Sequence, residues 1–359
     1  MAFGSAVHPH LFASLVVKDA LVLDVQQQNA TSHLGDIVVE HNDTLFIHDC
    51  QFNQTGRLII KDNSQVTISN ATFISNWNPN ETPDEAYWRT KNVVLQNKSR
   101  LNIVNSELFL SANASYNRDE HCIIVCDDAI VDVTDSKISY SDGLGDYIYG
   151  RNNSRVWMRN VVMSTFYPVS YYGDYPKSGL ELEDQSQADV QNSTLDYASV
   201  GQTADSSGGQ SNCTLDIDAS KLEFLGIFGT DFSSVRLSSS KVSRFDLNGQ
   251  DSSARLTNTT VGELNKHYTN ARLVLSNSSI QNIYVSDSSN MWVVWELPLF
   301  GQVEIPYAWV PYIIPAFAAC VVIVFVIVGL ALFFNARRKR KRKDENDAPQ
   351  RSQTSFEPA

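Results

Sequence analysis

Two groups of acidic residues are the best candidates for chemistry in this sequence. Asp127 and Asp128 follow His121 closely, and Asp142 and Asp146 enclose a short glycine-containing loop. A pair of carboxylates can provide the two catalytic groups of glycoside hydrolysis. An acidic cluster beside a base can instead hold Ca²⁺ and remove a proton, as a polysaccharide lyase requires.

These groups lack the wider patterns that such enzymes need. Each is a single cluster in a turn-rich segment, and Asp-Gly is itself a turn signal, so the competing interpretation is an ordinary solvated loop. The sequence contains no phosphate-binding glycine loop, nucleophile elbow or zinc motif. The spacing of Cys122 and Cys126 is only a weak metal signal. We therefore expect no catalytic residue, no metal site and no cofactor.

A short repeated phrase predicts the elements that must position these residues. It reads apolar, any, apolar, any, Asn/Asp/Ser, small polar, any, apolar, as in the segment from Leu45 to Phe52. Period-two alternation that ends in Asn or Asp indicates a half-buried strand running into a turn. We call the Asn/Asp/Ser position the anchor; the anchors are Asp49, Asn70, Asn105, Asp135, Asn160, Asn192, Ala219, Ser239, Asn258 and Asn277, with a degenerate copy near Val294.

The spacing of the anchors favours a coil of strands. The steps between them range from 19 residues (239 to 258) to 35 residues (70 to 105), which is typical of stacked coils whose insertions emerge at turns. A β-sandwich also explains the alternation, but not the recurring phrase.

Over about residues 20–300 the chain resembles the right-handed parallel β-helix proteins, the pectate-lyase-like superfamily in the broad sense. The resemblance implies an all-β, single-stranded right-handed parallel β-helix of about 11 rungs. Residues 1–40 would form an N-terminal cap or first coil, and residues 41–300 the β-helix ectodomain.

The longer steps predict loops that carry many of the aromatic residues. Trp77 and Trp88 lie in one such insert, and Tyr171 and Tyr172 lie in another. Trp and Tyr dominate interaction hot spots, so we expect these four residues to contact a surface partner or a second copy of the chain. The short later steps predict a tight stalk.

Residues 313–334 form a run of 22 residues without a charged side chain. A helix of this length spans about 33 Å, enough for a hydrocarbon core of about 30 Å. Seven consecutive basic residues follow and predict a cytoplasmic tail at 335–359. We therefore expect a juxtamembrane segment at 301–312 and one transmembrane helix in the bilayer at 313–334. Anionic lipid head groups are expected at Arg337, Arg338, Lys339 and Arg340.

The charge distribution agrees with an external N-terminal part. The formal net charge of the chain is −12 and that of the tail from residue 335 is +4, so residues 1–334 carry −16. An acidic exterior argues against nucleic acid or an anionic polysaccharide as a tightly bound partner. The apolar stretch 11–17 is short and lacks a basic flank, so no signal peptide is expected there. A tail anchor with the β-helix in the cytosol is the rival topology, but it places the cations on the wrong side.

Twelve Asn-x-Ser/Thr sequons indicate an N-glycosylated exterior. Four coincide with anchors, where the turn pattern creates sequons by accident; these asparagines either carry glycans or face inward: Asn70, Asn192, Asn258 and Asn277. Eight others are expected to be modified: Asn29, Asn42, Asn53, Asn80, Asn97, Asn113, Asn152 and Asn212.

The cysteines predict at most one disulfide. Cys122 and Cys126 share one insert, where a turn can bring them into disulfide range. Cys50 and Cys213 belong to rungs about 29 Å apart, too far for a disulfide.

Together these features predict a non-catalytic cell-surface glycoprotein: a rigid β-helix stalk, adhesin or envelope-layer component held in the cell membrane by one C-terminal helix. The alternative is a membrane-tethered polysaccharide lyase or hydrolase that uses one of the two acidic groups. Self-assembly through the sides of the coil into a lattice is a third interpretation. The dense sequons, few cysteines and lone anchor resemble archaeal surface proteins in style.

Overall fold

The computed structural model describes most of the repeat region and little of the C-terminal part. The described residues are 15–17, 20–24, 31–76, 92–111, 122–141, 146–165, 178–201, 212–228, 232–249, 251–266, 271–285, 292–297, 301–306, 328, 330 and 333. The chain divides into two compact units, Met1–Glu304 and Ile305–Ala359. All of the well-formed repeat copies lie in the first unit.

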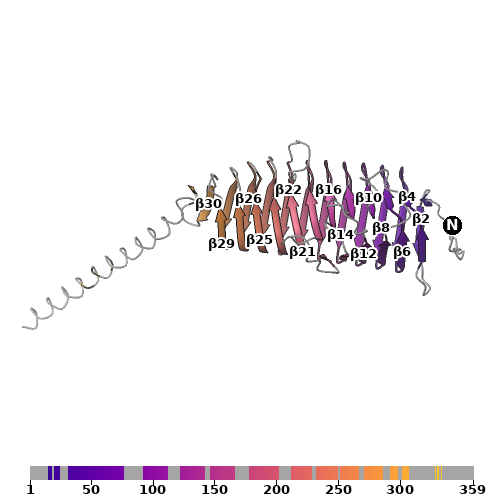
Figure 1. Ribbon diagram of the computed structural model, residues 1–359, viewed down its shortest axis with the longest axis horizontal. Coiled ribbons are helices and arrows are strands. Elements are labelled where there is room, and N and C mark those ends of the chain that lie inside the picture. Colours follow the sequence, from indigo (N-terminus) through magenta and orange to yellow (C-terminus); the bar gives the residue numbers. More distant parts are fainter. Residues whose placement is uncertain are drawn as a thin grey trace, which may run out of the picture. The chain divides into compact units, whose positions relative to one another are not determined.

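The first unit is an all-β solenoid of parallel strands. Up to β30, each strand pairs in parallel with the equivalent strand of the next coil, so coils that are neighbours in space are neighbours in sequence. Figure 1 shows this order as a steady change of colour from β2 to β30. Within the described ranges, the coils form one sheet of 18 strands and one of 13 strands. This arrangement is consistent with the predicted parallel β-helix.

The 13-stranded sheet contains the strands of the repeated phrase. It consists of β2 (Ala20–Asp24), β5 (Thr44–His48), β8 (Gln65–Ser69), β11 (Arg100–Val104), β14 (Ile130–Thr134), β17 (Arg155–Arg159), β20 (Gln187–Gln191), β22 (Thr214–Asp218), β24 (Ser234–Ser238), β26 (Ser253–Thr257), β28 (Arg272–Ser276), β30 (Trp292–Leu297) and β31 (Gly301–Pro306). The sheet therefore extends into the segment that the sequence assigns to the juxtamembrane region.

The 18-stranded sheet contains three kinds of strand. Those that precede the 13-stranded sheet in each coil are β1 (Leu15–Val17), β4 (Ile37–Val39), β7 (Leu58–Ile60), β10 (Val93–Leu95), β13 (Ile123–Val125), β16 (Asp146–Gly150) and β19 (Ser178–Leu182). Those that follow an anchor, or its equivalent position, are β3 (Thr31–Leu34), β6 (Gln51–Thr55), β9 (Thr72–Asn76), β12 (Glu107–Ser111), β15 (Lys137–Ser141) and β18 (Val162–Thr165). In the later coils the two kinds are fused, as β21 (Thr194–Val200), β23 (Lys221–Ile227), β25 (Lys241–Leu247), β27 (Thr260–Lys266) and β29 (Ser279–Val285).

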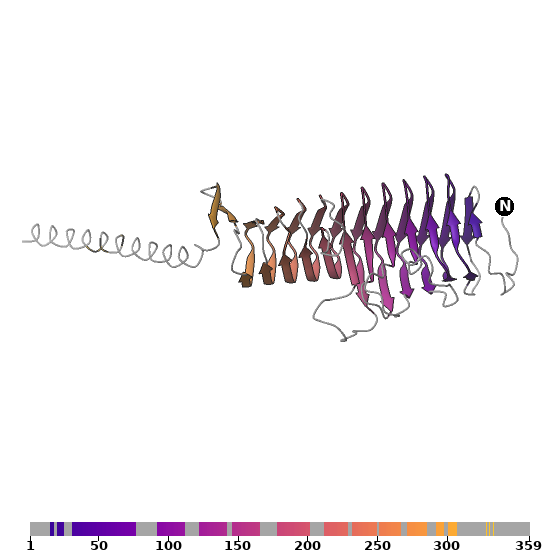
Figure 2. The ribbon, with the colours of Figure 1, turned by 45° about the horizontal axis from the view of Figure 1, so that its top comes forward.

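The fused strands explain the short later coils. A single seven-residue strand such as β23 replaces two strands and their connection. Successive anchors in this part, Ala219, Ser239 and Asn258, are accordingly 20 and 19 residues apart. Figure 2 shows the fused strands stacked in line with those of the earlier coils.

The chain leaves the 13-stranded sheet through a turn centred on the repeat anchor. All ten anchors from Asp49 to Asn277 have a positive φ, between +46° and +55°. This left-handed conformation costs an ordinary residue about 1–2 kcal/mol, and Asn and Asp tolerate it best. The demand for positive φ explains why Asn and Asp recur in the phrase.

The small polar residue after the anchor satisfies the backbone of this anchor turn. Ser136 Oγ accepts a hydrogen bond from the backbone N–H of Ser106 (3.0 Å) and donates one to the carbonyl of Thr134 (2.7 Å). Buried backbone groups need such partners. Serines that accept from the preceding coil in the same way are Ser106, Ser193, Ser220, Ser240 and Ser278.

A second left-handed position, absent from the predicted phrase, lies where the chain enters the 13-stranded sheet. Its φ lies between +57° and +64°. Each coil with both positions therefore needs two residues that tolerate positive φ, one on either flank of this sheet. We call this the second turn; its left-handed residues are His41, Asp62, Asn97, Asp127, Asn152, Asp184 and Asp251.

The two apolar positions of the phrase stack into inward-facing columns. Leu45 pairs in register with Val66, and Ile47 with Ile68, and all four side chains are fully buried. Each buried aliphatic side chain contributes about 1.5–3 kcal/mol relative to exposure. Because every coil repeats the columns, one core runs through the whole stack.

The second unit is described at only a few positions. Val328, Leu330 and Phe333 are helical, and about half or more of each side chain is exposed. Within the described residues, no helix has the length and hydrophobicity of a membrane span. Most of 313–334 and the basic run lie outside the described residues, so the transmembrane helix stays a prediction.

Candidate functional site

The first acidic group from the sequence lies in the second turn. Asp127 Oδ2 accepts a hydrogen bond from the backbone N–H of Asn97 (3.2 Å), and its Oδ1 accepts one from Asn152 Nδ2 (2.9 Å). Asp128 accepts one from Asn153 Nδ2 (3.3 Å) on the next coil. These contacts tie three coils together, so Asp127 has a structural role.

The remaining predicted site residues are mostly outside the described part. Asp146 is the first residue of β16, and nothing is described of its side chain. Asp142 and the four predicted contact residues, Trp77, Trp88, Tyr171 and Tyr172, lie outside the described residues. Their roles remain predictions.

The predicted disulfide between Cys122 and Cys126 is wrong. Both residues, like Cys50 and Cys213, are thiols that form no disulfide in the structure. The residues between them form strand β13 rather than a turn. Four residues of extended chain separate two Cα atoms by about 13 Å, whereas a disulfide needs less than about 7 Å.

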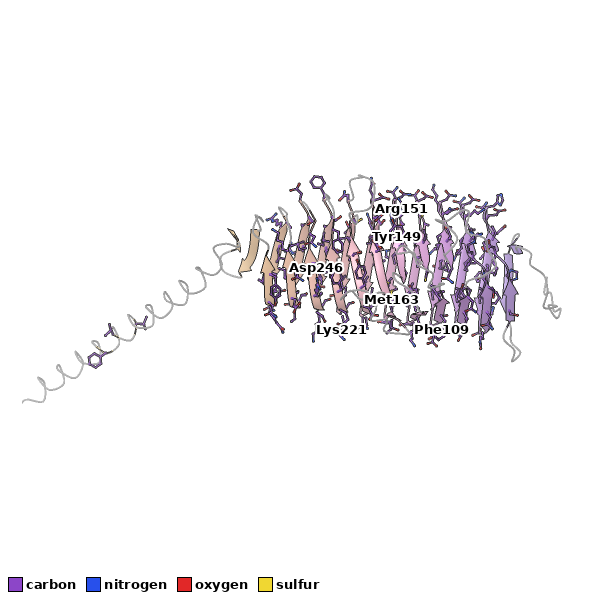
Figure 3. The ribbon with its side chains drawn as sticks, in the orientation of Figure 1. Phe109, Tyr149, Arg151, Met163, Lys221 and Asp246 are labelled. Atoms are coloured by element: carbon purple, nitrogen blue, oxygen red, sulfur yellow. The ribbon has the colours of Figure 1, made fainter. Side chains whose placement is uncertain are left out.

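A buried acidic group lies at residues that no sequence motif marks. The Tyr149 hydroxyl donates a hydrogen bond to Glu183 Oε2. The Arg151 Nε lies 3.9 Å from Glu183 and 3.8 Å from Asp184, and its guanidinium carbon lies 5.8 Å from the Tyr149 ring. Figure 3 shows Tyr149 and Arg151 close together on the stack. The Glu183 carboxylate therefore has a hydroxyl donor and a nearby cation, which suits a structural cluster.

A second buried carboxylate is equally well satisfied. Asp246 accepts two hydrogen bonds from Arg244, at 3.0 and 3.1 Å, and one from Asn265 Nδ2 at 2.8 Å. Its side chain is almost fully buried. Among the described residues, no three His, Cys, Asp or Glu side chains are grouped so as to hold a metal ion.

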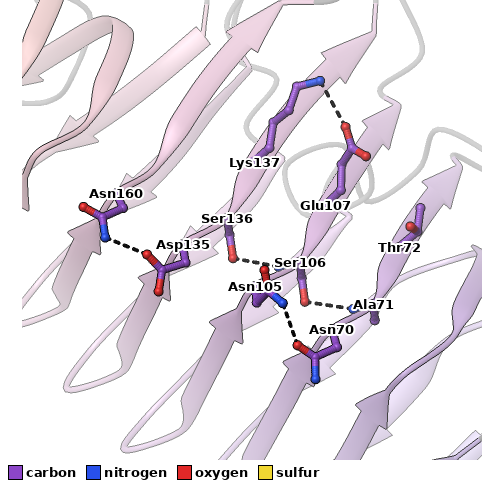
Figure 4. Close-up of a pocket in the computed structure, with 10 residues that line it drawn as sticks. All are labelled: Asn70, Ala71, Thr72, Asn105, Ser106, Glu107, Asp135, Ser136, Lys137 and Asn160. Carbon is purple, nitrogen blue, oxygen red and sulfur yellow. Dashed lines mark hydrogen bonds and ion pairs between the residues drawn. The ribbon is translucent and has the colours of Figure 1, made fainter.

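A polar groove of about 530 Å³ runs along the anchor turns (Figure 4). Asn105 Nδ2 donates to Asn70 Oδ1 (2.8 Å), and Asn160 Nδ2 donates to Asp135 Oδ1 (2.6 Å). On the adjoining strands Lys137 pairs with a glutamate at 3.0 Å. Most polar groups of the groove therefore bind one another, which suits a structural ladder better than a ligand site.

The sequon asparagines lie on both flanks of the 13-stranded sheet. The four at anchor turns point to solvent, so the inward-facing interpretation is wrong for them; the left-handed turn directs their side chains outward. Asn97 and Asn152 have the same conformation in the second turn. Exposed sequon asparagines are Asn42, Asn70, Asn97, Asn152, Asn192, Asn212, Asn258 and Asn277. Asn53 is half-buried in β6, and Asn29, Asn80 and Asn113 lie outside the described residues.

The outer face of the 13-stranded sheet carries an exposed tryptophan. Trp157, on β17, is 37% exposed. It is in register with Asp132 on β14 and with Asp189 on β20. A depression of about 250 Å³ borders it, lined by Asp132, Thr134, Trp157, Met158, Arg159, Asp189 and Gln191. We call the outer surface of β14 to β28 the tryptophan face.

Charged groups of both signs surround this tryptophan. The guanidinium carbon of Arg100 lies 5.9 Å from the Trp157 ring, and its Nη2 lies 3.4 Å from Asp132 Oδ2. Beyond Asp189 the same row continues with Asp216, whose Oδ2 lies 3.7 Å from Arg236 Nη1. Partial burial raises the pKa of the Asp216 carboxyl, Arg236 opposes this shift, and Asp189 adds to it.

The tryptophan face could not be read as a site in the sequence. Residues that are neighbours on this face are 19 to 32 positions apart in the sequence and meet only through the register of the coils. No protein-family model, no curated protein and no solved structure matches this chain.

Proposed function

We propose that this protein is a non-catalytic cell-surface glycoprotein of the adhesin type. It is a right-handed parallel β-helix that recognises a partner through the tryptophan face. One observation carries this proposal: Trp157 is exposed at the centre of a regular sheet and is flanked by Asp132 and Asp189. Exposed aromatic residues among charged neighbours are typical of interaction hot spots.

A membrane anchor completes the proposal. The uncharged run 313–334 is long enough to span a bilayer. The basic residues from Arg337 favour a cytoplasmic tail in contact with anionic lipid. The acidic N-terminal part is then external, where sequons are modified. The exposed asparagines in the turns on both flanks of the 13-stranded sheet are suited to carry those N-glycans.

A single substitution tests the recognition surface. The purified chain is added to cells that express the same full chain on their surface. Trp157→Ser in the added chain is expected to lower its binding to these cells by about 30-fold, because hot-spot residues contribute about 2 kcal/mol or more. The melting temperature should stay the same, since the indole is on the outer face. Binding can be measured by flow cytometry with labelled protein.

Phe46→Ser is the matched control. Phe46 occupies the same row of the sheet, on β5, and is 36% exposed. It lies outside the tryptophan face, so this variant should bind like the parent. Equal binding by the parent and Trp157→Ser would contradict the proposal.

The second candidate function is polysaccharide hydrolysis, and one observation favours it. Asp189 and Asp216 face outward on neighbouring strands, and the pKa of Asp216 is raised, by burial first and by Asp189 in addition. Neighbouring strands are about 4.8 Å apart, which is near the carboxylate separation of about 5 Å in retaining glycosidases. A carboxyl group with a raised pKa beside a second carboxylate is typical of the general acid in such enzymes.

Turnover separates the two candidates. A hydrolase would release reducing ends from a panel of soluble polysaccharides, and Asp189→Asn and Asp216→Asn would each abolish the release. No product from the parent chain with any polysaccharide would leave the non-catalytic proposal standing.

A further inference from the structure

The central row of the tryptophan face has its charges divided between two halves. From β14 to β22 the row contains Asp132, Trp157, Asp189 and Asp216. From β24 to β28 it contains two arginines followed by a valine: Arg236, Arg255 and Val274. The side chains from Asp132 to Arg255 point away from the core, as the alternating burial of their strands shows. Val274, by contrast, is buried. One half of the row is therefore acidic and the other half is basic.

We propose that the tryptophan face binds the same face of a second copy of this chain, with the two solenoids antiparallel. The two-fold axis would pass between β22 and β24. The proposal rests on the proposed function for its biological setting, because it names the partner of that same surface. Association of two copies does not itself require a membrane, so it can be tested separately from the proposed function.

This axis brings opposite charges together along the central row. Asp216 faces Arg236 of the second copy, and Asp189 faces Arg255 of the second copy. Close interfacial charge pairs set the register of an interface and can contribute to its affinity. By symmetry each pair occurs twice, as an isologous interface requires.

The exposed tryptophan also finds a place in this antiparallel arrangement. Trp157 is as far from the axis as Val274, so the indole would lie over strand β28 of the second copy, in which Val274 itself is buried. The outer rows are mostly uncharged and polar where they meet, for example Gln191 opposite Thr257. The one like-charged contact, Arg155 opposite Arg272, is on an outermost row, where both side chains can extend into solvent.

The alternative face-to-face arrangement is excluded by charge. If the copies were parallel, each coil would face itself across the axis. Asp189 would then oppose Asp189, and Arg255 would oppose Arg255, along the whole row. Like charges placed opposite one another cost several kcal/mol in an interface. The charge pattern therefore selects the antiparallel dimer.

The face is large enough for a specific contact. Seven strands about 4.8 Å apart and about 16 Å long give roughly 540 Å² per copy. The total of roughly 1,100 Å² exceeds the roughly 1,000 Å² expected of a biological interface. In such a dimer the C-terminal ends of the two solenoids point in opposite directions. Anchored copies would thus belong to two facing membranes, which suits an adhesin.

Charge reversal on the full chain in detergent tests the dimer. Asp189→Arg and Arg255→Asp should each weaken self-association at least tenfold in sedimentation equilibrium, because each places like charges together twice. The double variant Asp189→Arg/Arg255→Asp should restore association. The two residues lie three strands apart in one copy, about 14 Å, so a pair within one chain cannot cause the rescue. Glu223→Arg, on the 18-stranded sheet, is the control and should associate like the parent.

Two outcomes would overturn the inference. One is unchanged association in both single variants, and the other is a double variant that associates no better than the singles. If Trp157→Ser still reduces binding to cells while the reversals have no effect, the face recognises a different partner. That result would reject the dimer and leave the proposed function intact.

Discussion

At the scale of single residues, the repeated phrase is explained by backbone conformation and hydrogen bonding. The anchor provides positive φ, and the next residue accepts the N–H of the preceding coil, as Ser136 does for Ser106. The type of turn residue was predictable because only a few residues tolerate that φ. The outward direction of the anchor side chains could not be predicted, because the alternation of apolar and polar residues applies only within a strand and the anchor lies outside it.

Ala219 is the anchor least suited to its conformation. Its φ is +48°, and its side chain cannot form the contacts that Asn offers. Ala219→Asn is expected to raise the free energy of unfolding by about 1 kcal/mol, measured by chemical denaturation. Thr257→Asn, in the extended strand β26, should give no increase. A lower stability of Ala219→Asn than of the parent would contradict this account of the anchor.

At the scale of strands and turns, the sequence predicted one turn of each coil and missed the other. The anchor turn follows a strand with regular alternation. The second turn follows short strands at which inserts of variable length end, so its spacing carries no period. The wrong disulfide has the same cause, because Cys122 and Cys126 flank one of these short strands, which was not predicted. The apolar, β-branched run from Ile123 to Val125 was nevertheless a strand signal in the sequence.

Strand register also places a lysine in an apolar column. Lys266, at the end of β27, is in register with Leu247 and Val285 and is fully buried. Burial lowers its pKa from 10.5 to about 8. Between these values the unfolded chain binds more protons than the folded chain, so stability should rise from pH 8 to about pH 10.5.

Replacement of this lysine should remove that rise. Lys266→Met is expected to be more stable than the parent at pH 7.5 and to lose its advantage towards pH 10.5, in thermal melts at several pH values. Lys241→Met, at an exposed position, is the control and should keep the pH profile of the parent. If Lys266→Met kept the pH dependence of stability of the parent, this account of the buried lysine would be contradicted.

At the scale of the whole molecule, the sequence predicted the coil but not the faces of the coil. Local phrases determine which residues point inward, so the parallel solenoid could be predicted from them. The tryptophan face depends on which coil stacks on which, and inserts of unequal length hide that register. The separation of Asp189 from Arg255 into acidic and basic halves became visible only with the paired strands.

The central claim is that an external solenoid is joined to an internal tail by one membrane span. The most direct measurement is protease protection in cells that express the full chain with an epitope tag after Ala359. Protease added to intact cells should remove the solenoid and leave a small, membrane-bound fragment that carries the tag. Digestion of the tag should require permeabilised cells. A tag that is lost from intact cells, or a solenoid that is digested only after permeabilisation, would contradict the account.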